Sequence, residues 1–181
     1  MRNAVLASLL CVLLTSQLRA QFILIDADEG TFPSVLSPNF MQGYDFVPQR
    51  DLALTAIGFW DEGQDGLPRS FEIGIWETDS QTLLRSVIIE DDPIDESLSA
   101  SGGAWRFEEL YFGVRLNAGT TYSLAFQVGP TTLVATDALL VDFADITTNP
   151  DISIEDNQRF LATDQFVFPT NSTPAGPSEP I

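Results

Sequence analysis

Apolar and polar residues alternate along short stretches of this chain, with the two-residue period of half-buried β-strands. The clearest case is residues 121–128, where Tyr122, Leu124 and Phe126 alternate with small or polar residues. Gly119 precedes this stretch and tolerates the positive φ that a tight turn needs. No long window has helical periodicity. The strands predicted from these patterns are residues 22–26, 43–48, 52–60, 71–77, 82–90, 104–116, 121–128, 132–136, 139–143 and 159–168.

Many short strands separated by turn signals favour an antiparallel sandwich over a parallel α/β sheet. The predicted fold class is therefore all-β, a single antiparallel β-sandwich or jelly-roll-like domain over residues 21–169. Residues 90–103 have the composition of an acidic surface loop. Residues 170–181 are rich in Pro, Ser and Thr and are predicted to form a disordered tail.

Residues 1–20 have the pattern of a secretory signal peptide. Arg2 supplies a basic start, an apolar run follows, and Ala20 is the small residue before the expected cut. The run is shorter than the roughly 20 apolar residues that span a bilayer. We therefore expect cleavage after residue 20, a secreted extracellular protein, and no membrane span after cleavage.

Composition narrows the chemistry further. Cys11 is the only cysteine and lies in the signal peptide, and the chain has no histidine and no lysine. These absences exclude a disulfide, a Ser-His triad, a histidine-ligated zinc site and a lysine Schiff base in the cleaved protein. A glycoside hydrolase needs only two carboxylates, but among 26 acidic residues a pair carries little information. We therefore expect no enzymatic activity.

Negative charge dominates the expected surface. All eight basic residues are arginines, and two of them leave with the signal peptide, so the cleaved chain has a formal charge of 6 − 26 = −20. Such a surface repels nucleic acid and anionic membranes and attracts cations. Nucleic acid is therefore not an expected partner.

One segment approximates a calcium-binding loop. Asp61, Asp65, Gly66 and Glu72 match positions 1, 5, 6 and 12 of an EF-hand loop. A conventional EF-hand is excluded because Gly63 occupies the third ligand position and both flanks are predicted strands. A looser calcium site at Asp61, Asp65 and Glu72 is the functional prediction, and a solvated loop is the alternative.

The strands on either side of this segment are predicted to pair as a hairpin, with Trp60 opposite Phe71. Asp61 and Glu72 would then be diagonal neighbours, about 7–8 Å apart at the backbone. Trp76 would lie on the same face as Glu72 and is therefore a better candidate for exposure than Trp60, which would face inward. Because exposed aromatic rings can stack on sugars, Trp76 is a candidate ligand-binding residue, with core packing as the alternative.

Five motifs follow one another in the chain: LTAIGF (54–59), DGL (65–67), SFEIGIW (70–76), LL (83–84) and LNAGTTY (116–122). Their order resembles a family of secreted bacterial domains of unknown function, many of which carry a PEP-CTERM sorting tail. The resemblance covers residues 40–170 and implies a secreted β-sandwich without an established catalytic residue. Phe71 stands where the family often has a histidine, and residues 178–181 do not resemble the sorting tail.

These observations favour a secreted, acidic, non-enzymatic extracellular module, a component of the cell surface, matrix or biofilm that calcium stabilises. A carbohydrate-binding module that uses an exposed Trp76 is the second hypothesis. A carboxylate-based glycoside hydrolase is the third. The expected partners are extracellular polysaccharide or other surface proteins.

Overall fold

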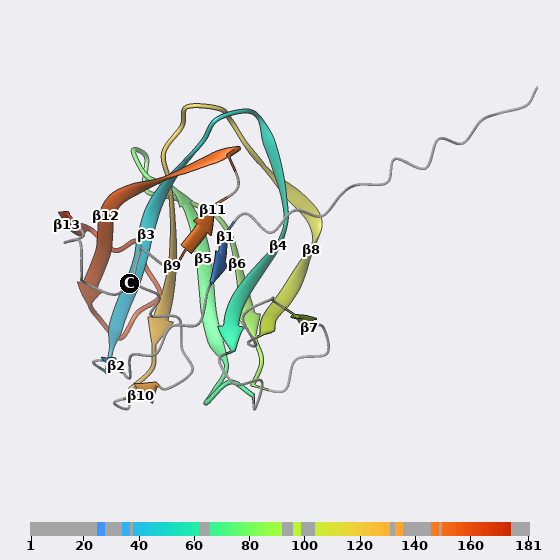
Figure 1. Ribbon diagram of the computed structural model, residues 1–181. Coiled ribbons are helices and arrows are strands. Elements are labelled where there is room, and N and C mark those ends of the chain that lie inside the picture. Colours follow the sequence, from blue (N-terminus) through green and yellow to red (C-terminus); the bar gives the residue numbers. More distant parts are fainter. Residues whose placement is uncertain are drawn as a thin grey trace, which may run out of the picture.

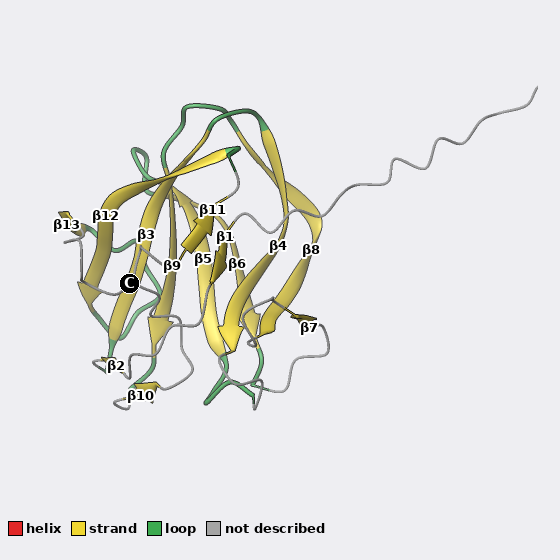
Figure 2. Cartoon of the chain, viewed as in Figure 1, coloured by secondary structure: helices red, strands yellow, loops and turns green. Residues whose placement is uncertain are grey.

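A computed structural model describes residues 25–27, 34–36, 38–61, 66–91, 96–98, 104–130, 133–135, 146–148 and 150–174 of the chain. These residues form β-strands and no helix (Figure 2), which confirms the predicted all-β class. Accordingly, this part of the chain contains no helix able to cross a membrane. The predicted signal peptide lies outside the described residues.

The strands are numbered in chain order (Figure 1). They are β1 (Ile25–Ala27), β2 (Ser34–Leu36), β3 (Phe40–Pro48), β4 (Leu52–Asp61), β5 (Phe71–Glu77), β6 (Thr82–Ile89), β7 (Glu96–Leu98), β8 (Ala104–Leu116), β9 (Tyr122–Val128), β10 (Leu133–Ala135), β11 (Ile146–Thr148), β12 (Ile152–Ala162) and β13 (Asn171–Pro174).

Two antiparallel sheets form the sandwich. The larger has the strand order β13-β12-β3-β9-β5-β6 and the smaller has the order β4-β8-β7. Rings from the two sheets meet between them: the Phe59 centroid on β4 lies 4.3 Å from that of Phe71 on β5 and 5.2 Å from that of Phe126 on β9. Two short two-stranded sheets, β1-β11 and β10-β2, complete the described structure.

Period-two alternation on β5 and β9 fills the space between the sheets. Phe71, Ile73 and Ile75 are each at most 3 % exposed and belong to the main core together with Tyr122 and Phe126. Burying each such side chain contributes roughly 1.5–3 kcal/mol. The predicted inward face of both strands is thus confirmed. The tight turn predicted at Gly119, just before β9, is also present.

Gly119 lies in that turn with a φ of 72°, the left-handed region that glycine adopts without strain. Its backbone N–H donates to the Pro48 carbonyl oxygen at 2.8 Å. Asp51 holds the same turn, because its Oδ1 accepts from the Ala118 N–H at 3.0 Å and its Oδ2 accepts from Arg115 at 2.8 Å. The hydrogen bond from Ala118 and the Arg115 guanidinium lower the pKa of Asp51.

The predicted hairpin between β4 and β5 is wrong. Trp60 of β4 pairs with Trp105 of β8, and β5 pairs with β6 and β9 in the other sheet. The chain crosses from one sheet to the other after β4, so Phe59 and Phe71 stack across the core. Phe59 therefore takes the inward position predicted for Trp60, which packs against Trp105 instead.

The end of the chain also departs from the prediction. β12 begins at Ile152, before the predicted strand at 159–168, and ends at Ala162. Residues Asn171–Pro174 pair with β12 as β13, so the predicted disorder is wrong for this part of the tail. The short β7 lies within the predicted acidic loop. The predicted strand at 139–143 lies outside the described residues.

Candidate functional site

Asp61, the first predicted calcium ligand, ends β4 as a fully buried side chain. Phe59, two residues earlier, faces the main core, and the period-two rule points Asp61 to the same side. Asp61 Oδ2 accepts hydrogen bonds from Arg106 Nε at 2.7 Å, from an Arg106 terminal nitrogen, and from the Gly66 N–H at 3.2 Å. Arg106 is itself only 5 % exposed. The carboxylate is therefore one half of a buried ion pair.

The other oxygen of this carboxylate, Asp61 Oδ1, is buried and has no hydrogen-bond partner within the described part of the chain. Asp65, the second predicted ligand, lies outside the described residues. Because Arg106 already neutralises Asp61, the pair supplies less attraction for a cation than an unpaired carboxylate would.

Glu72, the third predicted ligand, is on β5 opposite Ile88 of β6. Its neighbours Phe71 and Ile73 face the core, so Glu72 points to the outer face of the larger sheet. The structure therefore does not bring Asp61 and Glu72 together; the larger sheet lies between their side chains. Among the described residues no three carboxylates are grouped as metal ligands. Calcium binding through Asp65 stays a prediction.

Trp76, the predicted sugar-stacking residue, is 2 % exposed. Its ring centroid lies 5.2 Å from that of Phe166 and 6.3 Å from that of Phe168. A Cβ on Gly74 would lie 2.5 Å from the Trp76 ring, so the glycine leaves the space that the indole fills. The hypothesis of an exposed Trp76 is therefore wrong and the alternative, core packing, is confirmed, because the segment after β12 folds over the outer face of the sheet.

The other two tryptophans are also buried. Trp60 and Trp105 are 2 % and 7 % exposed, and their ring centroids are 5.4 Å apart. Phe107 stacks on Trp105 at 6.1 Å. All three tryptophans of the chain therefore contribute to packing. None of them is exposed enough to stack on a sugar, so the structure does not support a carbohydrate site built on a tryptophan.

A second buried carboxylate was missed in the sequence. Asp45 on β3 is 1 % exposed, and both of its oxygens accept from Arg159 Nε, at 2.9 and 2.8 Å. Ser123 Oγ also donates to Asp45 Oδ1 at 2.5 Å, and the same hydroxyl lies 2.8 Å from Thr78 Oγ1. Arg159 extends over the Phe168 ring at 5.4 Å. A lone acidic residue inside the apolar strand GYDFVP is the signal that could have identified this network.

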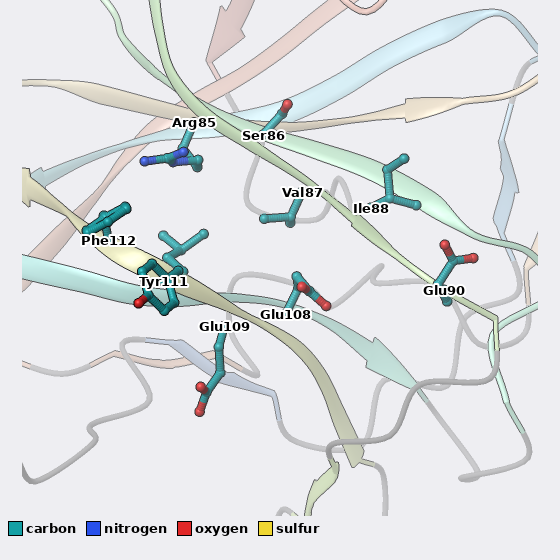
Figure 3. A pocket seen from close by; sticks show the side chains of 10 residues that line it. Arg85, Ser86, Val87, Ile88, Glu90, Glu108, Glu109, Tyr111 and Phe112 are labelled. Atoms are coloured by element: carbon teal, nitrogen blue, oxygen red, sulfur yellow. The ribbon is translucent and has the colours of Figure 1, made fainter.

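An open cleft of about 450 Å³ lies between β6 and β8 (Figure 3). It is lined by residues 85–88 and Glu90 on one side and by residues 108–112 on the other. Its walls combine aliphatic, aromatic and charged side chains. This cleft was not predicted, because β6 and β8 belong to different sheets and the sequence pattern does not show which strand edges lie side by side.

The fold and these sites define an all-β sandwich protein in which two buried carboxylates are counterions of arginines. Comparison of the chain with protein-family models, curated proteins and solved structures gives no match. The resemblance to secreted domains with a PEP-CTERM tail therefore stays a prediction.

Proposed function

We propose that this protein is a secreted, non-enzymatic β-sandwich module of the cell surface or of an extracellular matrix such as a biofilm. One structural observation supports the non-enzymatic part most directly. The buried carboxylates of Asp45 and Asp61 are each engaged by a buried or half-buried arginine. A carboxylate in such a pair serves as a counterion, whereas a glycosidase acid or nucleophile must face its substrate.

The two buried ion pairs also suit a secreted module that has no disulfides. Each pair joins two strands of one sheet: Asp61 and Arg106 connect β4 to β8, while Asp45 and Arg159 connect β3 to β12. The chain has no cysteine after the expected cleavage site. Packing and paired charges thus take the place of the disulfides common in secreted domains.

The proposal that the protein is exported rests on the signal-peptide pattern of residues 1–20, and it can be tested directly. The full chain with a C-terminal tag is expressed in a Gram-negative host, and the exported fraction is collected for N-terminal sequencing. We expect a mature chain that starts at Gln21. A matched variant, Leu9→Arg with Leu10→Arg, breaks the apolar run and should stay uncleaved in the cytoplasm. Cytoplasmic retention of the unmodified chain would contradict the proposal.

The non-enzymatic part has its own test. The purified protein is incubated with a panel of soluble polysaccharides, and reducing ends are measured over time. We expect no increase above a heat-denatured control. Release that disappears when Glu108 and Glu109, the adjacent carboxylates of the cleft, are both replaced by glutamine would show an active hydrolase and overturn this part.

A further inference from the structure

The cleft between β6 and β8 lies at two strand edges that have no partner in the described structure. β6 ends the larger sheet and pairs only with β5. β8 pairs with β7 only over Ala104–Arg106, so its outer edge is unpaired from Phe107 to Leu116 within the described part. Unpaired edges present rows of N–H and C=O groups on which an extended chain can add as a further strand.

A bulge in β8 turns two aromatic rings toward solvent beside these edges. Leu54 pairs with Val114 and Ala56 pairs with Glu109, so residues 110–113 stand opposite Thr55 alone. Within this bulge Tyr111 is 93 % exposed and Phe112 is 71 % exposed. Bulges commonly redirect side chains at functional sites. Two adjacent exposed rings on a soluble surface indicate an interaction site rather than packing.

The opposite wall of the cleft comes from β6. Ile73 and Ile75 of β5 face the core, and their partners Val87 and Arg85 take the same side of the sheet. Figure 3 shows Arg85 and Val87 directed toward β8, whereas Ile88 points away. Ile88 is 53 % exposed, so apolar surface continues over the rim of the cleft.

The charges along the cleft are uneven. The lining includes one arginine, Arg85, and three glutamates, Glu90, Glu108 and Glu109, a net charge of 1 − 3 = −2. In the described structure none of these four side chains forms a salt bridge; Glu90 accepts a hydrogen bond from Ser70 Oγ at 2.7 Å. Arg85 and Glu90 are about 17 Å apart along an extended strand. The glutamate end therefore favours a cationic occupant.

We propose that this cleft binds an extended basic segment of a partner protein, which adds as a strand along the edge of β6 with its apolar side chains against Tyr111 and Phe112. A second copy of this chain is disfavoured, because two cleaved molecules of formal charge 6 − 26 = −20 repel each other. The proposal goes beyond export and depends only on the folded domain.

The test uses a fluorescein-labelled peptide of four Arg-Val repeats and the purified protein, with fluorescence anisotropy as the readout. We expect saturable binding that weakens in 0.5 M NaCl, and no binding of a Glu-Val repeat peptide. The double variant Tyr111→Ala with Phe112→Ala should weaken binding about tenfold, as expected for exposed aromatic anchors. Methylation of alternate peptide nitrogens should weaken it at least as much, because strand addition needs those N–H groups.

A matched pair of charge variants separates the cleft from the general acidity of the protein. Glu108→Gln with Glu109→Gln should weaken peptide binding about tenfold. Asp79→Asn with Asp164→Asn removes the same charge from exposed residues outside the cleft and should leave the affinity within about twofold. Circular dichroism melts of all variants check that the fold is intact.

Several results would overturn the proposal without affecting export. Equal weakening by both charge pairs would show diffuse electrostatic attraction. Absence of peptide binding would remove the proposed partner class. Binding of cellohexaose that Tyr111→Ala abolishes would assign the cleft to sugars, and dimerisation in analytical ultracentrifugation that the same variant abolishes would assign it to a second copy.

Discussion

The substitution Arg106→Met should destabilise the protein severely, because it leaves the Asp61 carboxylate buried without its counterion. The side chains of Arg106 and Asp61 are 6 % and 0 % exposed, so water cannot replace the lost partner. Among the described residues, the Gly66 N–H would be the remaining hydrogen-bond donor to this carboxylate. Removing one partner of a buried pair costs about 3–5 kcal/mol, a large share of a typical unfolding free energy of roughly 5–15 kcal/mol.

Two further variants separate the effect of the charge from the effect of the side-chain volume. Replacing both partners, Asp61→Leu with Arg106→Met, removes the uncompensated charge and should restore most of the lost stability. Arg115→Met breaks the exposed ion pair with Asp51, in which the Arg115 side chain is 75 % exposed and the Asp51 side chain is 57 % exposed. This substitution should lower the free energy of unfolding by at most about 1 kcal/mol.

Urea unfolding followed by tryptophan fluorescence measures these differences. The probe is local, because the Trp60 and Trp105 rings pack together on the strands that carry the pair. For a domain of this size about 1 kcal/mol corresponds to about 2–4 °C in melting temperature. The Arg106→Met melt should therefore fall by about 6–20 °C. A loss of less than about 1 kcal/mol, or a double variant as unstable as the single one, would refute the reasoning.

Four other predictions concern the turn, the outer cluster, acid stability and calcium. Gly119→Ala should cost about 1–2 kcal/mol in urea unfolding through backbone strain alone, since no atom lies within 4 Å of the added Cβ; an unchanged midpoint would contradict this. Gly74→Val should displace the Trp76 indole and lower the melting temperature, with a red shift of tryptophan emission as the diagnostic sign. The lowered pKa of Asp51 stabilises the fold above its unfolded pKa of about 3.9, and this stabilisation is lost as pH falls through the lower folded pKa. The advantage of wild type over Asp51→Asn at pH 7 should therefore shrink as the solution is acidified below that unfolded pKa; a constant difference would exclude the mechanism. If Asp65 binds calcium, millimolar calcium should raise the melting temperature and Asp65→Ala should abolish the increase, whereas equal melts in calcium and chelator would end this hypothesis.

Local patterns in the sequence predicted most of the strands, because the alternation of apolar and polar residues within a strand shows which of its faces is buried. The ranges 71–77 and 104–116 coincide with β5 and β8, and the alternation in residues 121–128 identifies the buried face of β9. Gly119 likewise marks its turn, since the required φ depends on one residue. These features need no knowledge of distant partners.

The candidate site was predicted less well because its chemistry depends on which strands are neighbours. The residues Asp61 and Glu72 are close in sequence, yet their strands belong to different sheets. Trp76 alternates outward as predicted, but Phe166 and Phe168 from the end of the chain cover it. A period of two fixes the face of a strand and leaves open what packs on that face.

The sequence by itself therefore determined the all-β class, most strand positions, the inward residues of β5 and β9, and the excess of negative charge. Only the tertiary structure decided that Asp61 and Asp45 form ion pairs with Arg106 and Arg159. It also decided that Phe166 and Phe168 cover Trp76, and that a cleft lies between the edges of β6 and β8. The physical reason is that side-chain alternation is a local property of the chain. Strand neighbours are instead chosen by the burial and charge pairing of the whole domain.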